Sequence, residues 1–228
     1  MPHLYIMPTD KWGDLLVAYE KAFATYPRPA KTFDDLFWLF TGTFVGEAFV
    51  PDEGKMSRGA IRLNHAEGKA LFKAVSESTG NILEIGRFFG GSTVLISVAG
   101  SGRLLVSVDR APEHYRVCAA YFERCQPQLL LLTQDSSVPI GARFGCLFID
   151  GDHTFEGVLS DTKTHWPAVD VGGLVVYHDA VRGAYGSHEG VTCVTEALAL
   201  GYGELIATAD SLAVFRKVKE LPAEFQGR

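Results

Sequence analysis

Short apolar runs alternate with longer amphipathic stretches from residue 64 to the end of the chain. Five of these runs predict strands buried on both faces; they span residues 81–85, 104–108, 129–132, 146–149 and 174–177. The stretches around them predict helices over residues 64–78, from residue 92 onward, and over 113–125, 155–165 and 191–200. Strands that alternate with helices indicate a parallel sheet covered by helices on both faces. Residues 204–207 and 212–216 predict two closing strands, so we expect an α/β fold with a doubly wound, mostly parallel sheet of seven strands.

The first 60 residues differ in composition from the rest, because they are rich in aromatic residues and prolines. Apolar residues at helical spacing predict a helix near residues 10–26. Thr32, followed three positions later by Asp35, resembles a capping box at the start of a second helix. We therefore expect an N-terminal helical cap over residues 1–60, which could serve as an oligomer contact, and a main domain over residues 61–228.

Composition excludes several classes of partner. The chain has 228 residues and a net charge of −6 without a long basic run, which argues against nucleic acid and anionic membranes as main partners. No run of 18 apolar residues predicts a membrane span. The N-terminus lacks the pattern of a signal peptide, and the four cysteines form no Cys-x-x-Cys pair. Reduced thiols in a cytoplasmic protein are therefore expected.

Candidate chemistry gathers at the ends of the predicted strands. In an open α/β sheet the ligand binds beyond the carboxyl ends of the strands. The residues found at or just after those ends are Glu84, Gly86, Asp109, Asp135, Asp150 and Asp179. One acid in such a place is an ordinary turn residue, but the repetition from strand to strand indicates a binding site.

The first strand end opens a glycine-rich turn, Glu84-Ile-Gly-Arg-Phe-Phe-Gly90-Gly-Ser-Thr93. Glycines let the backbone approach a ligand closely, and the helix that follows offers free N–H groups. The spacing is not Gly-x-Gly-x-x-Gly, which argues against a nicotinamide-dependent oxidoreductase. A tight strand-to-helix turn without a ligand is the structural alternative.

Two further strand ends could complete a nucleoside site. Asp109 ends the second predicted strand, where a carboxylate can accept hydrogen bonds from both hydroxyls of a ribose. The same side chain could instead cap the helix that begins near residue 112. Asp135 and Ser136, after the third strand, could read the edge of an adenine or could form only a polar turn.

The densest cluster lies in two segments, Ile-Asp150-Gly-Asp-His153 and Tyr-His178-Asp179. Hard oxygen ligands suit Mg²⁺ or Ca²⁺, and a nearby histidine suits proton transfer. If the two strands are neighbours, Asp150 and Asp179 can share a divalent metal ion. If they are not, the same acids are solvated turn residues that need no metal.

Taken together, the segments Glu-Ile-Gly-x-x-x-Gly-Gly-Ser-Thr, Ile-Asp-Gly-Asp-His and Gly-Gly-Leu-Val-Val-Tyr-His-Asp resemble the class I S-adenosylmethionine-dependent methyltransferases. Within that family the chain is most similar to small-molecule O-methyltransferases of the macrolide-sugar and cephalosporin-biosynthesis type. It is more distantly similar to catechol and caffeoyl-CoA O-methyltransferases. The resemblance covers about residues 64–217. It implies a Rossmann-like sheet with an antiparallel last strand.

The resemblance also implies roles for single residues. Those that would bind S-adenosylmethionine are Glu84, Gly86, Gly90, Ser92, Thr93, Asp109, Arg110, Asp135 and Ser136. Asp150, His178 and Asp179 would bind Mg²⁺, and His153, together with Asp150, would act in catalysis as the general base. One departure is His178, because metal-dependent relatives usually carry an acidic or similarly polar residue there and imidazole is a softer ligand than carboxylate.

The activity expected is therefore methyl transfer from S-adenosylmethionine to a hydroxyl of a small molecule, such as a sugar, a phenol or a natural-product intermediate, assisted by a divalent metal. Two alternatives remain: a metal-independent methyltransferase of the same fold, and a metal-dependent hydrolase that uses Asp150, Asp152 and His153 without a cofactor. A non-enzymatic module that only binds S-adenosylmethionine would not need His153.

Overall fold

The computed structural model describes residues 32–41, 43–45, 48–50, 60–111, 118, 121–122 and 128–227. Its main feature is a seven-stranded sheet in the order β5-β4-β3-β6-β7-β9-β8. The strands are β3 (Ile82–Ile85), β4 (Leu105–Asp109), β5 (Leu129–Thr133), β6 (Phe144–Ile149), β7 (Val169–Tyr177), β8 (Gly203–Ala209) and β9 (Leu212–Lys217). The first five are parallel, and β9 runs antiparallel to both of its neighbours. The predicted doubly wound sheet with an antiparallel last strand is thus confirmed.

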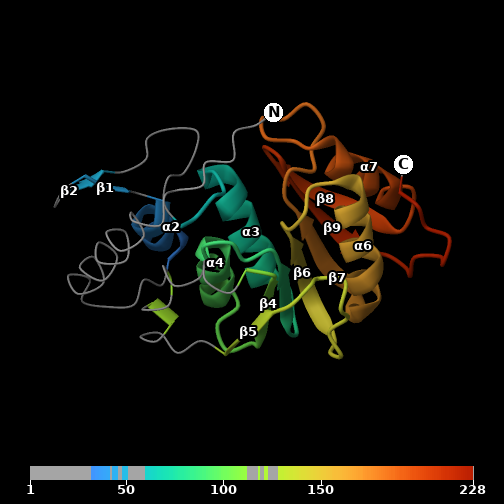
Figure 1. Cartoon of the computed structure of the whole chain (residues 1–228), viewed down its shortest axis with the longest axis horizontal. Helices are drawn as coiled ribbons and strands as arrows, with labels where there is room; N and C mark the ends of the chain where they lie inside the picture. Colours follow the sequence, from blue (N-terminus) through green and yellow to red (C-terminus); the bar gives the residue numbers. More distant parts are fainter. Residues whose placement is uncertain are drawn as a thin grey trace.

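Helices cover both faces of this sheet, as Figure 1 shows. One face carries α3 (His65–Glu77) and α4 (Gly91–Ala99), and the other carries α6 (Phe155–His165) and α7 (Glu189–Leu198). A short 3-10 turn, Trp166–Ala168, links α6 to β7. Within the described residues, no helix combines the length and the apolar character needed to cross a membrane.

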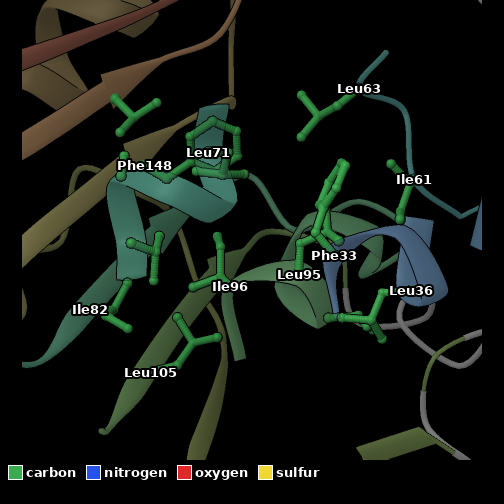
Figure 2. Close-up of a cluster of buried hydrophobic side chains, with 14 of the residues drawn as sticks. Phe33, Leu36, Ile61, Leu63, Leu71, Ile82, Leu95, Ile96, Leu105 and Phe148 are labelled. Carbon is green, nitrogen blue, oxygen red and sulfur yellow. The ribbon is translucent and has the colours of Figure 1, made fainter. Parts of the chain in front are cut away.

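Two separate hydrophobic cores follow from this layering. Phe148 of β6 packs into the core under α3 and α4, together with Leu71 and Ile96 (Figure 2). Its neighbour Leu147 points to the opposite face and packs into the core under α6 and α7, together with Val158. Alternation of this kind along a strand that is buried on both faces explains why the sequence of β6 is apolar throughout.

The short helix α2 (Phe33–Thr41) joins the first of these cores. Its side chains Phe33, Leu36 and Phe37 are buried there, and Figure 2 shows Phe33 and Leu36 on the side of Leu95 of α4. The backbone N–H of Asp35 donates to the hydroxyl of Thr32 over 3.3 Å, which is one half of the predicted capping box.

Other N-terminal elements either were not predicted or lie outside the described residues. β1 (Thr43–Val45) and β2 (Ala48–Val50) form an antiparallel pair that the sequence did not indicate. The helix predicted over residues 10–26 lies outside the described residues, as does most of the one predicted over 113–125.

β7 is longer than predicted, because it begins at Val169 and not at residue 174. Its pairing with β6 shifts register, since Phe144 pairs with Val169 whereas Cys146 pairs with Leu174. Gly172, at a φ of +87°, is one of the extra residues that β7 has between these two pairs. A bulge of this kind hides a strand from prediction, because glycines and a polar residue interrupt the apolar run.

The glycine-rich turn after β3 touches the chain that leaves β6. Gly86 has a φ of +89°, and a Cβ at this position would lie 2.0 Å from the backbone oxygen of Asp150. The backbone N–H of Asp150 in turn donates to the carbonyl of Ile85 over 2.8 Å. Only glycine permits this close approach, which holds two of the candidate strand ends together.

We expect the Gly86→Ala variant to lose about 3 kcal/mol or more of its free energy of unfolding, because it adds a backbone clash to an unfavourable positive φ. The matched control is Gly102→Ala, which has a φ of +83° and nothing within 4 Å of the added Cβ. That variant should lose only about 1 kcal/mol. Urea denaturation compares the two, and equal losses would contradict the close contact at Gly86.

Candidate active site

The glycine-rich turn rests on a buried carboxylate. Glu84 is fully buried, and its two oxygens accept hydrogen bonds from the hydroxyls of Ser92 and Thr93, each over 2.6 Å. The hydroxyl of Ser107 on β4 donates to it as well. Burial raises the pKa of Glu84, although these hydroxyls partly offset the rise. The structure therefore brings three predicted cofactor residues together, but they face one another beneath the turn and fix the start of α4.

Asp109 ties the same turn to the end of β4. Its Oδ2 accepts hydrogen bonds from the backbone N–H groups of Arg87 and Phe88, at 2.9 and 2.8 Å, and its Oδ1 accepts one from Ala111 at 2.7 Å. A carboxylate has about four acceptor positions, so the hydrogen bonds from the described residues leave one for a ligand. The next predicted residue, Arg110, is exposed beside this turn.

Arg87 is a residue of this turn that sequence reasoning missed. Its side chain is buried, and its Nη1 donates to the backbone oxygen of Ser107 over 2.7 Å. The guanidinium also reaches the backbone oxygen of Leu132 at 3.5 Å, so it links the turn to the ends of both β4 and β5. An arginine in a glycine-rich segment is normally solvent-exposed, and nothing local in the sequence signals its burial.

The predicted adenine side of the site is a polar turn above α6. Asp135 is exposed, and its Oδ1 accepts a hydrogen bond from the backbone N–H of Ser137 over 2.9 Å. The backbone oxygen of Ser136 accepts one from Nε2 of His165 over 2.7 Å. This geometry agrees with the turn that the sequence allowed, and it leaves a contact to adenine as a prediction.

Beneath this turn lies a buried acid that sequence reasoning also missed. Asp161 of α6 is 2% exposed, and its Oδ2 has no hydrogen-bond partner among the described residues. Burial raises the pKa of Asp161 from the usual 3.8 to about 6. A carboxylate without a partner for one oxygen is costly to bury, so this group favours the protonated form.

Asp161 should make stability depend on pH. Because its pKa is higher in the folded than in the unfolded chain, the folded state binds more protons between the two values, and its contribution to stability falls as pH rises through about 6. Asp161→Asn cannot ionise, so the variant should gain about 1 kcal/mol relative to wild type between pH 5 and pH 8. Urea denaturation of both proteins at both pH values tests this; a difference that does not change with pH would contradict it.

The second candidate cluster forms where β6 and β7 end side by side, with Ile149 paired to Tyr177. Oδ1 of Asp150 lies 3.2 Å from Nε2 of His153 and 3.1 Å from Nδ1 of His178. Asp179 approaches the same two rings, at 3.7 Å from His153 and 3.4 Å from His178. The four residues that the sequence singled out here are thus brought together.

Two members of this cluster were not foreseen as site residues. Nε2 of His178 lies 3.3 Å from Oε2 of Glu67, which belongs to the first turn of α3. His188, just before α7, places its Nε2 3.8 Å from Oδ2 of Asp179. The sequence predicts only a helix from residue 64 here, and the structure shows that Asn64 and Glu67 form a capping box at its start. A second role for a capping residue leaves no trace in local sequence.

Glu67 is itself held firmly. Its Oε1 accepts hydrogen bonds from the backbone N–H and the hydroxyl of Ser211, at 3.1 and 2.6 Å, and its Oε2 accepts one from the backbone N–H of Asn64 at 2.9 Å. The hydroxyl of Ser211 also lies 3.2 Å from Oδ1 of Asp179. The cluster is therefore a connected network that joins α3, β6, β7 and the turn before β9.

Opposite charges shape the electrostatics of this network. Burial opposes ionisation of Asp150, but His178 and His153 outweigh it and hold the pKa of Asp150 below its usual range. Burial likewise opposes protonation of His178, but Asp150 and Glu67 raise its pKa well above the usual value. For Asp179, burial and the nearby Asp150 raise the pKa, and the histidines offset only part of this.

The donor set can hold a metal ion. Within the described residues, one group of converging ligand atoms comprises Asp150, His153 and His178, and a second comprises His153, Asp179 and His188. Each group offers two nitrogen donors and one oxygen donor. Such a mixture suits Zn²⁺ or Fe²⁺ better than Mg²⁺, which prefers oxygen ligands alone.

Residues 83–180 match a family described as a methyltransferase domain. The match runs from β3 to the residue after Asp179 and so includes the glycine-rich turn and most of the acidic and histidine cluster. A search of curated proteins gives no match.

Several solved structures share the fold at low sequence identity. A putative caffeoyl-CoA O-methyltransferase from Staphylococcus aureus is 15% identical, with a TM-score of 0.56 over 69% of this chain and 86% of the other. The O-methyltransferase NovP is 16% identical, with a TM-score of 0.57 over 92% and 100% of the two chains. An SAH-bound methyltransferase from Podospora anserina is 13% identical, with a TM-score of 0.55 over 90% and 88%.

Proposed function

We propose that this chain, an S-adenosylmethionine-dependent methyltransferase, transfers the methyl group to a hydroxyl oxygen of a small molecule. The observation that carries the proposal is the backbone contact between Gly86 and Asp150. It sets the turn expected to hold the cofactor directly beside the carboxylate that orients His153. The similarity in fold to proteins described as O-methyltransferases supports oxygen as the acceptor atom.

The glycine-rich turn and its neighbours would hold the cofactor. Gly86 and Gly90, both at positive φ, set the path of this turn, because a Cβ on Gly86 would meet the backbone of Asp150 and one on Gly90 would meet Cys118. Asp109 has an acceptor position left for a ribose hydroxyl, and Asp135 lies exposed where the adenine is expected. Glu84 would act indirectly, since its hydrogen bonds to Ser92 and Thr93 fix the turn from below.

His153 would be the general base. Asp150 faces Nε2 of its ring at 3.2 Å, and a carboxylate in this place favours the tautomer that carries its proton on Nε2. The lone pair on Nδ1 then remains to accept a proton. The side chain is 32% exposed, so an acceptor molecule can reach the ring from solvent.

The reaction proposed is an in-line displacement. A lone pair of the acceptor oxygen forms the new bond to the methyl carbon while the carbon–sulfur bond breaks, and its electron pair stays on sulfur to leave a neutral thioether. The hydroxyl proton passes to Nδ1 of His153. The protein contributes by holding donor and acceptor in line at close distance and by removing this proton. The metal ion predicted at Asp150, His178 and Asp179 would lower the pKa of a bound hydroxyl when it is present.

A metal-dependent hydrolase fits the geometry less well. That alternative requires Asp152 as a member of the cluster, but its Oδ1 accepts a hydrogen bond from the backbone N–H of Thr154 over 2.9 Å at the start of α6. A hydrolase without a cofactor also gives no function to the glycine-rich turn and Asp109. A metal-independent methyltransferase is still compatible with every contact described.

Cofactor binding is the first test. We expect wild-type protein to bind S-adenosylmethionine with micromolar affinity in calorimetry, and Asp109→Asn to bind about tenfold more weakly or worse, because a charged acceptor is lost. The matched control is Asp170→Asn, which removes an exposed acid that pairs with Arg143 at the opposite end of β7. Absence of binding to wild type would overturn the proposed function.

His153→Gln tests the chemical step. Loss of a general base should lower kcat by about 10²–10⁴-fold with little change in S-adenosylmethionine affinity. The assay follows transfer of a labelled methyl group to a panel of sugar and phenol acceptors, with His65→Gln as a control on an exposed histidine of α3. Should His153→Gln keep the wild-type rate, the base lies elsewhere.

A further inference from the structure

We propose that Asp161 and His165, on the buried side of α6, are positioning residues that hold Ser136 for recognition of the adenine base. They would thereby set the specificity for the adenine half of the cofactor. The inference rests on the proposed function, because it requires S-adenosylmethionine as the ligand. It concerns two side chains that the proposed methyl transfer does not use.

The buried side of α6 is polar where a helix that only packs would be apolar. Its buried residues are Val158, Asp161, Thr162 and His165. The hydroxyl of Thr162 lies 3.0 Å from that of Tyr177, so these two groups satisfy one another. Asp161 and His165 each keep one buried atom, Oδ2 and Nδ1 respectively, without a hydrogen-bond partner among the described residues. Apolar side chains of similar size would stabilise α6 at least as well, so packing alone does not explain these two residues.

Both side chains converge on Ser136, in the turn after β5. Nε2 of His165 lies 2.7 Å from the backbone oxygen of Ser136. Because a carbonyl oxygen only accepts, the imidazole carries its proton on Nε2, and burial lowers the pKa of His165, which favours this neutral ring. The hydroxyl of Ser136 faces Asp161, where it lowers the pKa of the carboxyl against the effect of burial. One side of α6 thus holds Ser136 by its main chain and by its side chain.

This contact joins parts of the chain that the sheet separates. In the order of the strands, β4 and β3 lie between β5 and β6, and α6 follows β6. Three strand spacings amount to about 14 Å, so the turn after β5 and α6 meet over the intervening strands. Asp161 also approaches the turn after β6, because a Cβ on Gly151 would lie 3.2 Å from its Oδ2. One side chain therefore contacts both the turn that carries Ser136 and the turn that carries Asp150.

The turn held in this way has a main-chain donor for a base. Among the described residues, no group accepts a hydrogen bond from the backbone N–H of Ser136. An N–H in a fixed position can donate to a ring nitrogen of adenine, but not to N1 of hypoxanthine, which carries a hydrogen of its own. Recognition of this kind depends on where Ser136 lies, and that position is set by Asp161 and His165. The alternative is that both side chains only attach α6 to the turn, without influence on which base binds.

Calorimetry with two ligands tests the proposal. One is S-adenosylhomocysteine, the demethylated cofactor, and the other is S-inosylhomocysteine, in which hypoxanthine replaces adenine. We expect wild type to bind the adenine ligand about tenfold more tightly or better, because the base edge of hypoxanthine reverses the donor and acceptor positions. A wild-type preference near one would overturn the inference.

Variants of α6 assign this preference. His165→Phe keeps the ring without its N–H donor, and Asp161→Leu keeps the shape without the carboxyl group. Each should reduce the preference to about threefold or less, mainly by weakening the adenine ligand. His165→Gln retains an N–H donor and should keep most of the preference. If His165→Phe and Asp161→Leu weaken both ligands by the same factor, their role is structural and the inference is overturned.

Two further variants guard against effects on folding. Lys163→Leu changes an exposed residue of the same helix and should leave the preference unchanged. Ser136→Ala, at a half-buried position of the turn, removes only the hydroxyl that faces Asp161 and should lower the preference about threefold. An unchanged preference in Ser136→Ala and in every folded variant of Asp161 and His165 would overturn the inference.

The same titrations separate this inference from the proposed function. If wild type binds neither S-adenosylmethionine nor S-adenosylhomocysteine, the proposed function fails, and the inference fails with it. If wild type binds both but the variants leave the adenine preference intact, the proposed methyl transfer stands and only the role of Asp161 and His165 is overturned.

Discussion

β3 and β6 leave the sheet so close together that no side chain fits between the turns that follow them. A Cβ on Gly86 would overlap the backbone oxygen of Asp150, and the backbone bond from Asp150 to Ile85 holds the two turns at this distance. The glycine-rich turn and the acidic cluster lie at these two strand ends, so their separation is set by main chain and not by mobile side chains. In the proposed function, this main-chain contact would keep the methyl donor and the proton acceptor within reach of one another.

Buried polar bonds support both halves of this arrangement from beneath. Under the glycine-rich turn, Glu84 accepts hydrogen bonds from three hydroxyls, and the guanidinium of Arg87 donates to backbone oxygens of β4 and β5. Under the acidic cluster, Glu67 connects α3 to His178 and to Ser211. Groups of this kind are expensive to bury unless their partners are in place, so each helps to specify one geometry for the residues above it.

Much of the fold could be predicted because it depends on local patterns. The apolar runs placed β3, β4 and β6 within two residues of their ends, and the bounds predicted for α6 agree with those observed. The start of β7 was missed because its bulge at Gly172 interrupts the apolar run. Because ligands bind beyond the carboxyl ends of parallel strands, the sequence predicted that Asp150, His153, His178 and Asp179 form one cluster. The structure confirms that these side chains meet.

Glu67, Arg87 and Asp161 were missed for one reason, which is that their roles depend on parts of the chain far away in sequence. Glu67 meets His178 across 111 positions of sequence and Ser211 across 144, while Arg87 and Asp161 are defined by burial that depends on distant elements. Periodicity and spacing carry no information on such partners. The helix predicted from residue 64 gives no sign of a second role for Glu67, although its carboxylate both caps α3 and contacts His178.

That shared carboxylate links two processes that are usually independent. The first turn of a helix is normally where it frays, and its amides exchange with solvent faster than those of the core. In this protein the first turn of α3 cannot open without releasing Glu67 from His178 and Ser211. Local opening of the helix end is therefore thermodynamically coupled to occupancy of the site, and any ligand that tightens the cluster will slow hydrogen exchange at the beginning of α3.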